Sequence, residues 1–208
     1  PRCSCVCAAT DELRADPGVL LEVATLKHRF LTVGEALIHG DLHTGSVMVG
    51  GGRTVAMDPE FAFYGPVGYD LGALWANAAI AAVRASVLDR PAAFREHVAG
   101  IVPESWEAFG AELRALWPGR VDPFLSEGFL ERWLRSIWSD AVGYAATKAI
   151  RRMIGFAHVT DIETLEEPAR TAAAAVVVRF ARRFLLERAA ITDPAALWAV
   201  VTEEIARG

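Results

Sequence analysis

The chain has 208 residues, of which 53% are hydrophobic and 23% charged, a composition typical of a globular protein rather than a disordered one. Its formal net charge of −5 excludes a strongly basic nucleic-acid-binding protein. No apolar run reaches the roughly 18 to 20 residues that a membrane span needs. We therefore expect a soluble domain, or one large lobe of a longer protein, with neither nucleic acid nor membrane as a partner.

All three cysteines lie within the first seven residues, at Cys3, Cys5 and Cys7. A disulfide framework is therefore excluded for the rest of the chain. Alternating thiolates can bind a soft metal, but no second Cys/His cluster in the sequence completes a tetrahedral site. Because the chain starts at Pro1 and not at Met, we expect a missing start, with residues 1–15 as a disordered or artefactual end.

Glycine divides the remaining residues, 16–208, into two regions, because nine of the 17 glycines lie between Gly34 and Gly72. After a helix at 20–30, this glycine-rich region predicts a strand at 36–38 and a hairpin of strands 46–49 and 54–57. The rest predicts helix after helix, the fifth of them preceded by a capping box of Thr160 and Glu163. The expected helices are 69–88, 91–98, 105–116, 127–154, 161–189 and 194–206.

Candidate chemistry is concentrated in the segment His39-Gly-Asp-Leu-His-Thr-Gly-Ser46, which follows the strand at 36–38. It places Asp41 on a loop, and the hairpin returns the chain to Asp58-Pro-Glu60, 17 residues after Asp41. Phosphoryl transfer needs one carboxylate to orient the attacking hydroxyl and others to hold Mg²⁺ against the nucleotide phosphates. Protein kinases join two such motifs by a similar hairpin.

Each motif alone has a simpler interpretation. Gly-Asp is an ordinary turn, and Asp-Pro-Glu can end a strand. Their order, each after an apolar strand with a glycine turn between them, favours the functional interpretation for Asp41 and Asp58, and less strongly for Glu60. We expect His39 to fix the turn by hydrogen bonding rather than to shuttle protons, and the role of His43 stays open.

These segments, with 61–66 and Gly-Tyr-Asp-Leu-Gly at 68–72, resemble the S-methyl-5-thioribose kinase family of the aminoglycoside-phosphotransferase and choline-kinase-like group. The resemblance covers about 16–188 and includes 21–31 and 148–161. His-Gly-Asp indicates only the wider group. The Asp-Pro-Glu motif and the pair Arg151-Arg152 narrow it to this family.

The resemblance implies an α+β, mostly helical fold, the C-terminal lobe of a protein-kinase-like enzyme, with a small β-hairpin that carries the active site. It implies phosphorylation of 5-methylthioribose at its 1-hydroxyl in methionine salvage, with ATP and Mg²⁺ as cofactors. It also implies a cytoplasmic homodimer.

Site roles follow from the same resemblance. Asp41 is the catalytic carboxylate and contacts the sugar, Asp58-Pro59-Glu60 binds ATP, and Asp58 and Glu60 hold Mg²⁺. Arg151 and Arg152 bind substrate, although a solvated helix face is the alternative for both. In the wider group a metal-binding Asn stands where this chain has a serine, so Glu60 is expected to take over that coordination. The supporting residues are His39, Ser46 and Asp70.

Two parts of such a kinase are missing from this sequence. It has no glycine-rich loop, and its only lysines, Lys27 and Lys148, fall in helical patterns rather than on a strand. We therefore expect the N-terminal ATP-binding lobe to be absent, and this chain alone to bind nucleotide weakly with negligible turnover. The alternatives are a kinase of the same fold that acts on an aminoglycoside or choline-like alcohol, and an inactive lobe that serves as a binding module.

Overall fold

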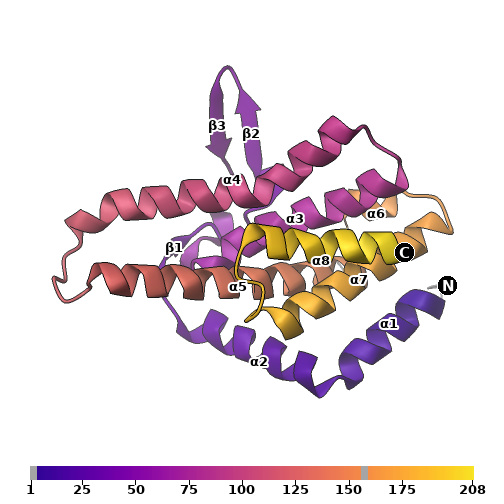
Figure 1. The fold of residues 1–208 in the computed structure, drawn as a ribbon, viewed down its shortest axis with the longest axis horizontal. Coiled ribbons are helices and arrows are strands. Elements are labelled where there is room, and N and C mark those ends of the chain that lie inside the picture. The colour runs from indigo at the N-terminus through magenta and orange to yellow at the C-terminus, as the bar shows by residue number, and fades with distance from the viewer. Residues whose placement is uncertain (1–3, 156–158) are drawn as a thin grey trace.

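The computed structural model describes residues 4–155 and 159–208, and it is mostly helical (Figure 1). None of the helices in these ranges is long and apolar enough to cross a lipid bilayer. The expected fold class, a mostly helical α+β structure with a small hairpin, is confirmed. The helices are α1 (Ser4–Ala15), α2 (Pro17–Thr32), α3 (Gly68–Val87), α4 (Ala92–Leu116), α5 (Glu127–Ile154), α6 (Thr160–Glu163), α7 (Ala169–Glu187) and α8 (Pro194–Arg207).

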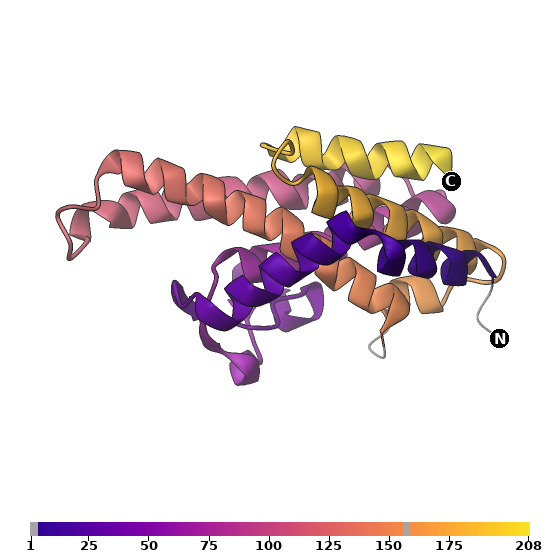
Figure 2. The same cartoon turned by 90° about the horizontal axis from the view of Figure 1, so that it is seen from below.

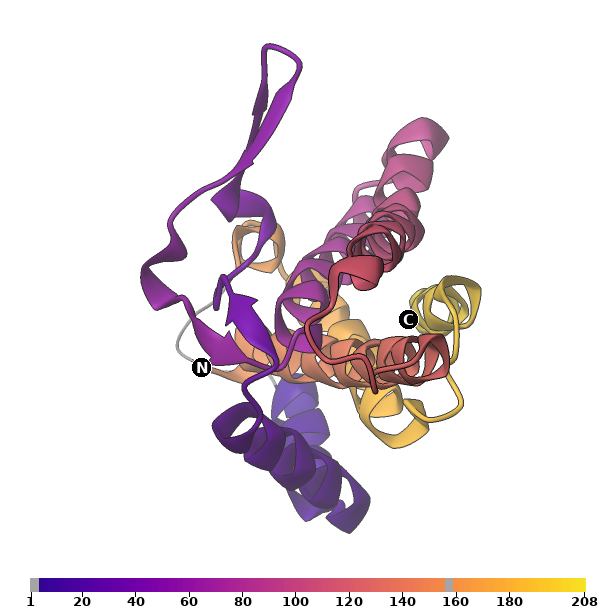
Figure 3. The same ribbon diagram turned by 90° about the vertical axis from the view of Figure 1, so that its left-hand side faces the viewer.

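The strands form two small antiparallel pairs, β1 (Ala36–Ile38) with β4 (Phe63–Gly65) and β2 (Val47–Gly50) with β3 (Arg53–Ala56). The turn between β2 and β3 is made by two glycines with φ of 56° and 72°, which side chains rarely adopt. The hairpin that the glycine-rich sequence predicted is therefore present, and it projects from the helical body (Figures 1 and 3).

Helices α3 and α5 approach closely because glycines of α3 line the contact. A Cβ on Gly72 would lie 2.5 Å from the carbonyl oxygen of Ala141, and one on Gly68 would lie 2.7 Å from that of Ile137. Any larger residue would have to push the two backbones apart. The contact therefore sets the first turn of α3 against the middle of α5.

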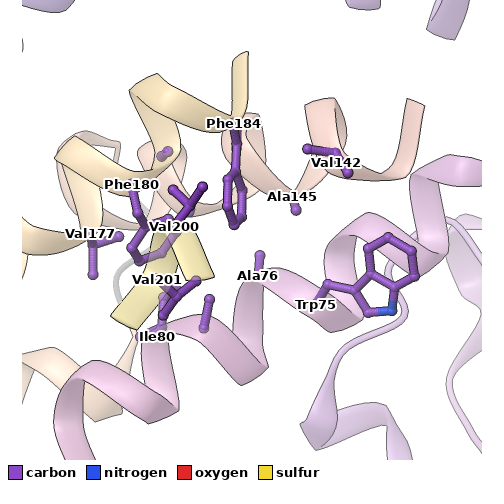
Figure 4. Packing of buried hydrophobic residues seen from close by; sticks show 14 of the residues in the cluster. Trp75, Ala76, Ile80, Val142, Ala145, Val177, Phe180, Phe184, Val200 and Val201 are labelled. Atoms are coloured by element: carbon purple, nitrogen blue, oxygen red, sulfur yellow. The ribbon is translucent and has the colours of Figure 1, made fainter. Parts of the chain in front are cut away.

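Side chains from α3, α5, α7 and α8 fill the space beside this contact (Figure 4). Trp75, Phe180 and Phe184 are fully buried there. Burying a side chain of this size contributes about 1.5–3 kcal/mol each relative to leaving it in water. The core thus packs α5 against α3 and α7.

Residues 4–15 form helix α1 rather than the disordered segment that was one of our two predictions for residues 1–15, and the other, an artefactual end, stays a prediction. Helix α1 lies against α7, and α2 lies beside it on the same side of the molecule (Figure 2). Leu13 of α1 is buried in the main core, and Asp16 caps α2 by accepting from the backbone N–H groups of Gly18 and Val19. Cys3 lies outside the described residues.

The prediction of two separate helices at 91–98 and 105–116 is wrong. The structure has one helix through Pro103. Val98 and Val102 are buried, and Trp106 packs on the same core. Because these positions follow the helical spacing on both sides of the proline, their packing outweighs the cost of about 3 kcal/mol for proline inside a helix.

The helix expected at 161–189 is also divided, into α6 and α7. The division falls before Pro168, whose ring disfavours helical conformation in the preceding residue. The predicted capping box also differs from the structure. Val159, and not Thr160, is the N-cap residue of α6, and Thr160 is the first residue of the helix. Its N-cap makes no side-chain hydrogen bond.

The α3–α5 contact gives a stability prediction. Gly72→Ala should lower the free energy of unfolding by about 1–3 kcal/mol, because the added methyl group overpacks the contact. Gly119→Ala is the matched control, since no atom lies within 4 Å of the position that its methyl group would take and the substitution restricts only the unfolded chain. Urea unfolding of the chain measures both, and equal stability of the two variants would contradict the contact.

Candidate functional site

Asp41 lies on the loop that follows β1, where its carboxylate contacts α5. Lys148 Nζ on α5 lies 3.1 Å from Asp41 Oδ1, and His43 Nε2 lies 3.7 Å from Asp41 Oδ2. The Asp41 side chain keeps 34% of its surface exposed. The carboxylate is therefore held on one side and open on another.

Lys148 was not a candidate in the sequence analysis. Only 8% of its side chain is exposed, and its ammonium lies 4.5 Å from the centre of the Tyr69 ring, a cation–π distance. One signal was present in the sequence: Lys148 and Arg152 are four residues apart, so they share a helix face. The contact with Asp41 itself joins residues 107 apart and has no local signature.

The charges around Asp41 decide its protonation. Partial burial by itself would raise its pKa, but the hydrogen bond and charge of Lys148, with the charges of His43 and Arg152, hold the pKa below its ordinary value of 3.8. Asp41 is therefore ionised at neutral pH, the state needed to accept a hydrogen bond from a hydroxyl.

Asp70, in the first turn of α3, fixes the loop that carries Asp41 by accepting hydrogen bonds from its backbone. Its carboxylate accepts the backbone N–H of His39 at 2.6 Å and that of Gly40 at 3.1 Å. Burial raises the pKa of Asp70, and these hydrogen bonds oppose the rise. Gly40 has φ of 84°, and a Cβ there would lie 2.2 Å from the carbonyl oxygen of Phe61. Only glycine fits this bend.

His39 and Ser46 hold the backbone of Asp41. His39 Nε2 lies 2.7 Å from the carbonyl oxygen of Met57, so this nitrogen donates and leaves Nδ1 to accept the N–H of Asp41 at 3.4 Å. The buried hydroxyl of Ser46 donates to the carbonyl oxygen of Asp41 at 3.0 Å. Both side chains act on the loop rather than facing an open site.

The same histidine joins the two sequence motifs, because Met57 directly precedes Asp58. The Met57 N–H also donates to the Ser46 carbonyl oxygen at 2.8 Å. Asp58 then adopts a left-handed conformation, with φ of 66°, and begins a short 3₁₀ turn, Pro59–Phe61. Asp58, Pro59 and Glu60 are all exposed.

Two exposed carboxylates are a fitting but incomplete donor set for Mg²⁺, which prefers oxygen ligands and keeps several of its own waters. Within residues 4–155 and 159–208, no group of three or more His, Cys, Asp or Glu side chains is placed to hold a metal ion. Asp58 and Glu60 therefore suit a Mg²⁺ ion whose remaining ligands are water and phosphate oxygens.

Arg151 and Arg152, which we predicted together as substrate-binding residues, differ in their exposure. Arg152 is half-buried and close enough for its charge to lower the pKa of Asp41. Arg151 is exposed, which agrees with the alternative of a solvated helix face for this residue. Arg152 is thus the stronger candidate for contact with a bound ligand.

Comparison with known proteins finds one family and several relatives that are similar to this chain. The family described as phosphotransferase enzyme family matches residues 8–109. A methylthioribose kinase of Geobacillus kaustophilus (strain HTA426) is 41% identical over 192 residues, which are 88% of this chain and 47% of that protein. A methylthioribose kinase of Yersinia pestis (strain Pestoides F) is 42% identical over 160 residues, 74% of this chain and 39% of that protein. The chain spans about half the length of the curated relatives it matches.

The hydrogen bonds between Asp70 and the backbone of the Asp41 loop can be tested in this chain. Asp70→Asn should lower the free energy of unfolding by about 1–3 kcal/mol, because an amide cannot accept both buried N–H groups with two oxygens. It should also speed hydrogen exchange of the Gly40 amide. Asp122→Asn is the control, since Asp122 accepts a backbone N–H in an exposed turn. Unchanged exchange at Gly40 would contradict these hydrogen bonds.

Proposed function

We propose that this chain, a homologue of the methylthioribose kinases and of the phosphotransferase enzyme family, is the catalytic lobe of a kinase that phosphorylates 5-methylthioribose at its 1-hydroxyl with ATP. The observation that carries the proposal is Asp41, an ionised and partly exposed carboxylate on a loop braced from both sides. Asp58 and Glu60, which follow the hairpin, would supply the carboxylates that phosphoryl transfer needs to hold Mg²⁺.

In this proposal Asp41 accepts a hydrogen bond from the sugar hydroxyl and orients its oxygen towards the γ-phosphorus of ATP. As the new O–P bond forms, the bond from γ-phosphorus to the bridging oxygen breaks, ADP leaves with that electron pair, and the hydroxyl proton passes to Asp41. Because such a transition state is loose, orientation matters more than basicity. The charge of Arg152 is suited to stabilise the phosphoryl oxygens.

Asp58 and Glu60, with Pro59 between them, would hold Mg²⁺ and the nucleotide. The metal supplies positive charge to the phosphate oxygens when it is bound. The Ser46 side chain is buried and points at the Asp41 carbonyl oxygen, whereas Glu60 is exposed. This supports assigning the second protein ligand to Glu60 rather than to Ser46.

The rest of the enzyme is part of the proposal. A glycine-rich loop and a strand lysine would come from an N-terminal lobe outside this sequence, so the chain alone should bind nucleotide weakly and turn over negligibly. Methionine salvage, a cytoplasmic location and a homodimer follow from the resemblance and stay within the proposal.

The charges around Asp41 favour a neutral sugar as substrate. Lys148 and Arg152 both act on this carboxylate. A cationic aminoglycoside or choline-like amine would meet these two positive charges at the point where its hydroxyl must bind. An inactive binding module would not need an ionised, open carboxylate at this position.

Turnover tests the proposal. A full-length enzyme that contains this chain should phosphorylate methylthioribose with ATP, and Asp41→Asn should lower kcat by about 10²–10⁴-fold, because the amide cannot accept the proton. Asp89→Asn, an exposed aspartate on another loop, should leave turnover unchanged. Activity retained in Asp41→Asn would refute the assigned role.

The metal assignment has its own test. Asp58→Asn and Glu60→Gln should each raise the Mg²⁺ concentration that gives half-maximal activity, about tenfold or more, because each removes one charged oxygen ligand. Glu112→Gln, an exposed residue of α4, is the control. A Mg²⁺ dependence that matches the wild-type enzyme in both variants would exclude these carboxylates as ligands.

A further inference from the structure

We propose that Lys148 is the positioning residue of this site: it holds one oxygen of Asp41 so that the carboxylate stays ionised and its other oxygen faces the incoming hydroxyl. The inference rests on the proposed function, since it names the residue that sets the geometry of the same carboxylate. Lys148 acts through Asp41 and is not assigned a contact with the substrate.

The Lys148 side chain is almost wholly buried, although it carries a charge. The side chain is 8% exposed, and taking an ammonium out of water is costly unless close partners replace the water. Two partners are present, the Asp41 carboxylate at 3.1 Å and the face of the Tyr69 ring at 4.5 Å. The ring and the carboxylate come from different elements and together fix where the ammonium lies.

A purely structural ion pair explains the arrangement less well. Buried ion pairs add little net stability compared with apolar residues of similar volume, because desolvation offsets the attraction. Here the pair also leaves Asp41 with 34% of its side chain exposed. An ion pair made only for stability has no reason to keep its carboxylate open to ligands.

The two carboxylate oxygens of Asp41 have different neighbours. Oδ1 accepts from Lys148, whereas Oδ2 lies 3.7 Å from His43 Nε2, beyond hydrogen-bonding distance. Oδ2 is therefore the oxygen left to accept a hydrogen bond from a substrate hydroxyl. With Ser46 and His39 holding the backbone, Lys148 removes the remaining rotational freedom of the side chain.

Among the described residues, Lys148 and Arg152 from α5 and His43 from its own loop are the positive or protonatable groups whose charges act on Asp41. Lys148 in turn faces Asp41 and the Tyr69 ring. A carboxyl whose pKa is depressed is ionised above that pKa and loses its charge as the pH falls through it. Removing the lysine should therefore move the protonation of Asp41 to higher pH.

The test measures kcat/KM against pH in the full-length enzyme for Lys148→Met and Lys148→Arg. For Lys148→Met we expect the acid limb to move to higher pH, kcat to fall about ten- to a hundredfold, and KM for ATP to stay unchanged. Lys148→Arg should restore the acid limb and part of kcat. Lys27→Met, at the other lysine of this 208-residue sequence, should match the wild-type enzyme.

Lys148→Gln covers the case in which the methionine variant fails to fold, because it keeps a hydrogen-bond donor and removes the charge. An acid limb that stays in place in the folded uncharged variants, or an arginine variant as impaired as they are, would overturn the inference. If the wild-type enzyme does not phosphorylate methylthioribose, the proposed function is wrong. The same profiles are then measured with the alcohol that a substrate panel identifies.

Discussion

The close approach of α3 and α5 is the constraint on which the site depends. Gly68 and Gly72 let the backbones meet with no side chain between them. Asp70 and the Tyr69 ring lie in the first turn of α3, and Lys148 lies further along α5. Because the two helices meet here, one braces the Asp41 loop through its backbone and the other pairs with its carboxylate. A wider helix contact would separate these partners.

A buried charge network ties the entrance of the loop to the same helix. Arg29 Nε on α2 donates to Asp140 of α5 at 2.7 Å, and Arg29 also pairs with Glu35. Glu35, just before β1, accepts the N–H of Val67 at the start of α3 at 3.0 Å. Burial raises the pKa of Asp140, and the charge of Arg29 opposes the rise. The strand that leads to Asp41 is thus fixed at both ends relative to α3 and α5.

Local signals in the sequence predicted the parts of the fold whose causes are local. The helix expected at 127–154 has those bounds in the structure because Ser126 caps it and Gly155 ends it, and the β2–β3 hairpin follows from its glycines. The course of α4 through Pro103 depends on packing against other helices. The pairing of Lys148 with Asp41 and the burial of Asp140 likewise depend on contacts over long sequence separations, so pattern and propensity could not reveal them.

This fold holds Asp41 as an ionised carboxylate, paired with Lys148, before any ligand binds. The most direct measurement is the pKa of the Asp41 carboxyl in the 208-residue chain, by carbon-detected NMR titration with Asp41→Asn for assignment. The structure predicts a pKa below the ordinary value of 3.8, because Lys148, His43 and Arg152 stabilise the charged form. A pKa at or above that value would mean that burial dominates and that Lys148 does not hold the carboxylate.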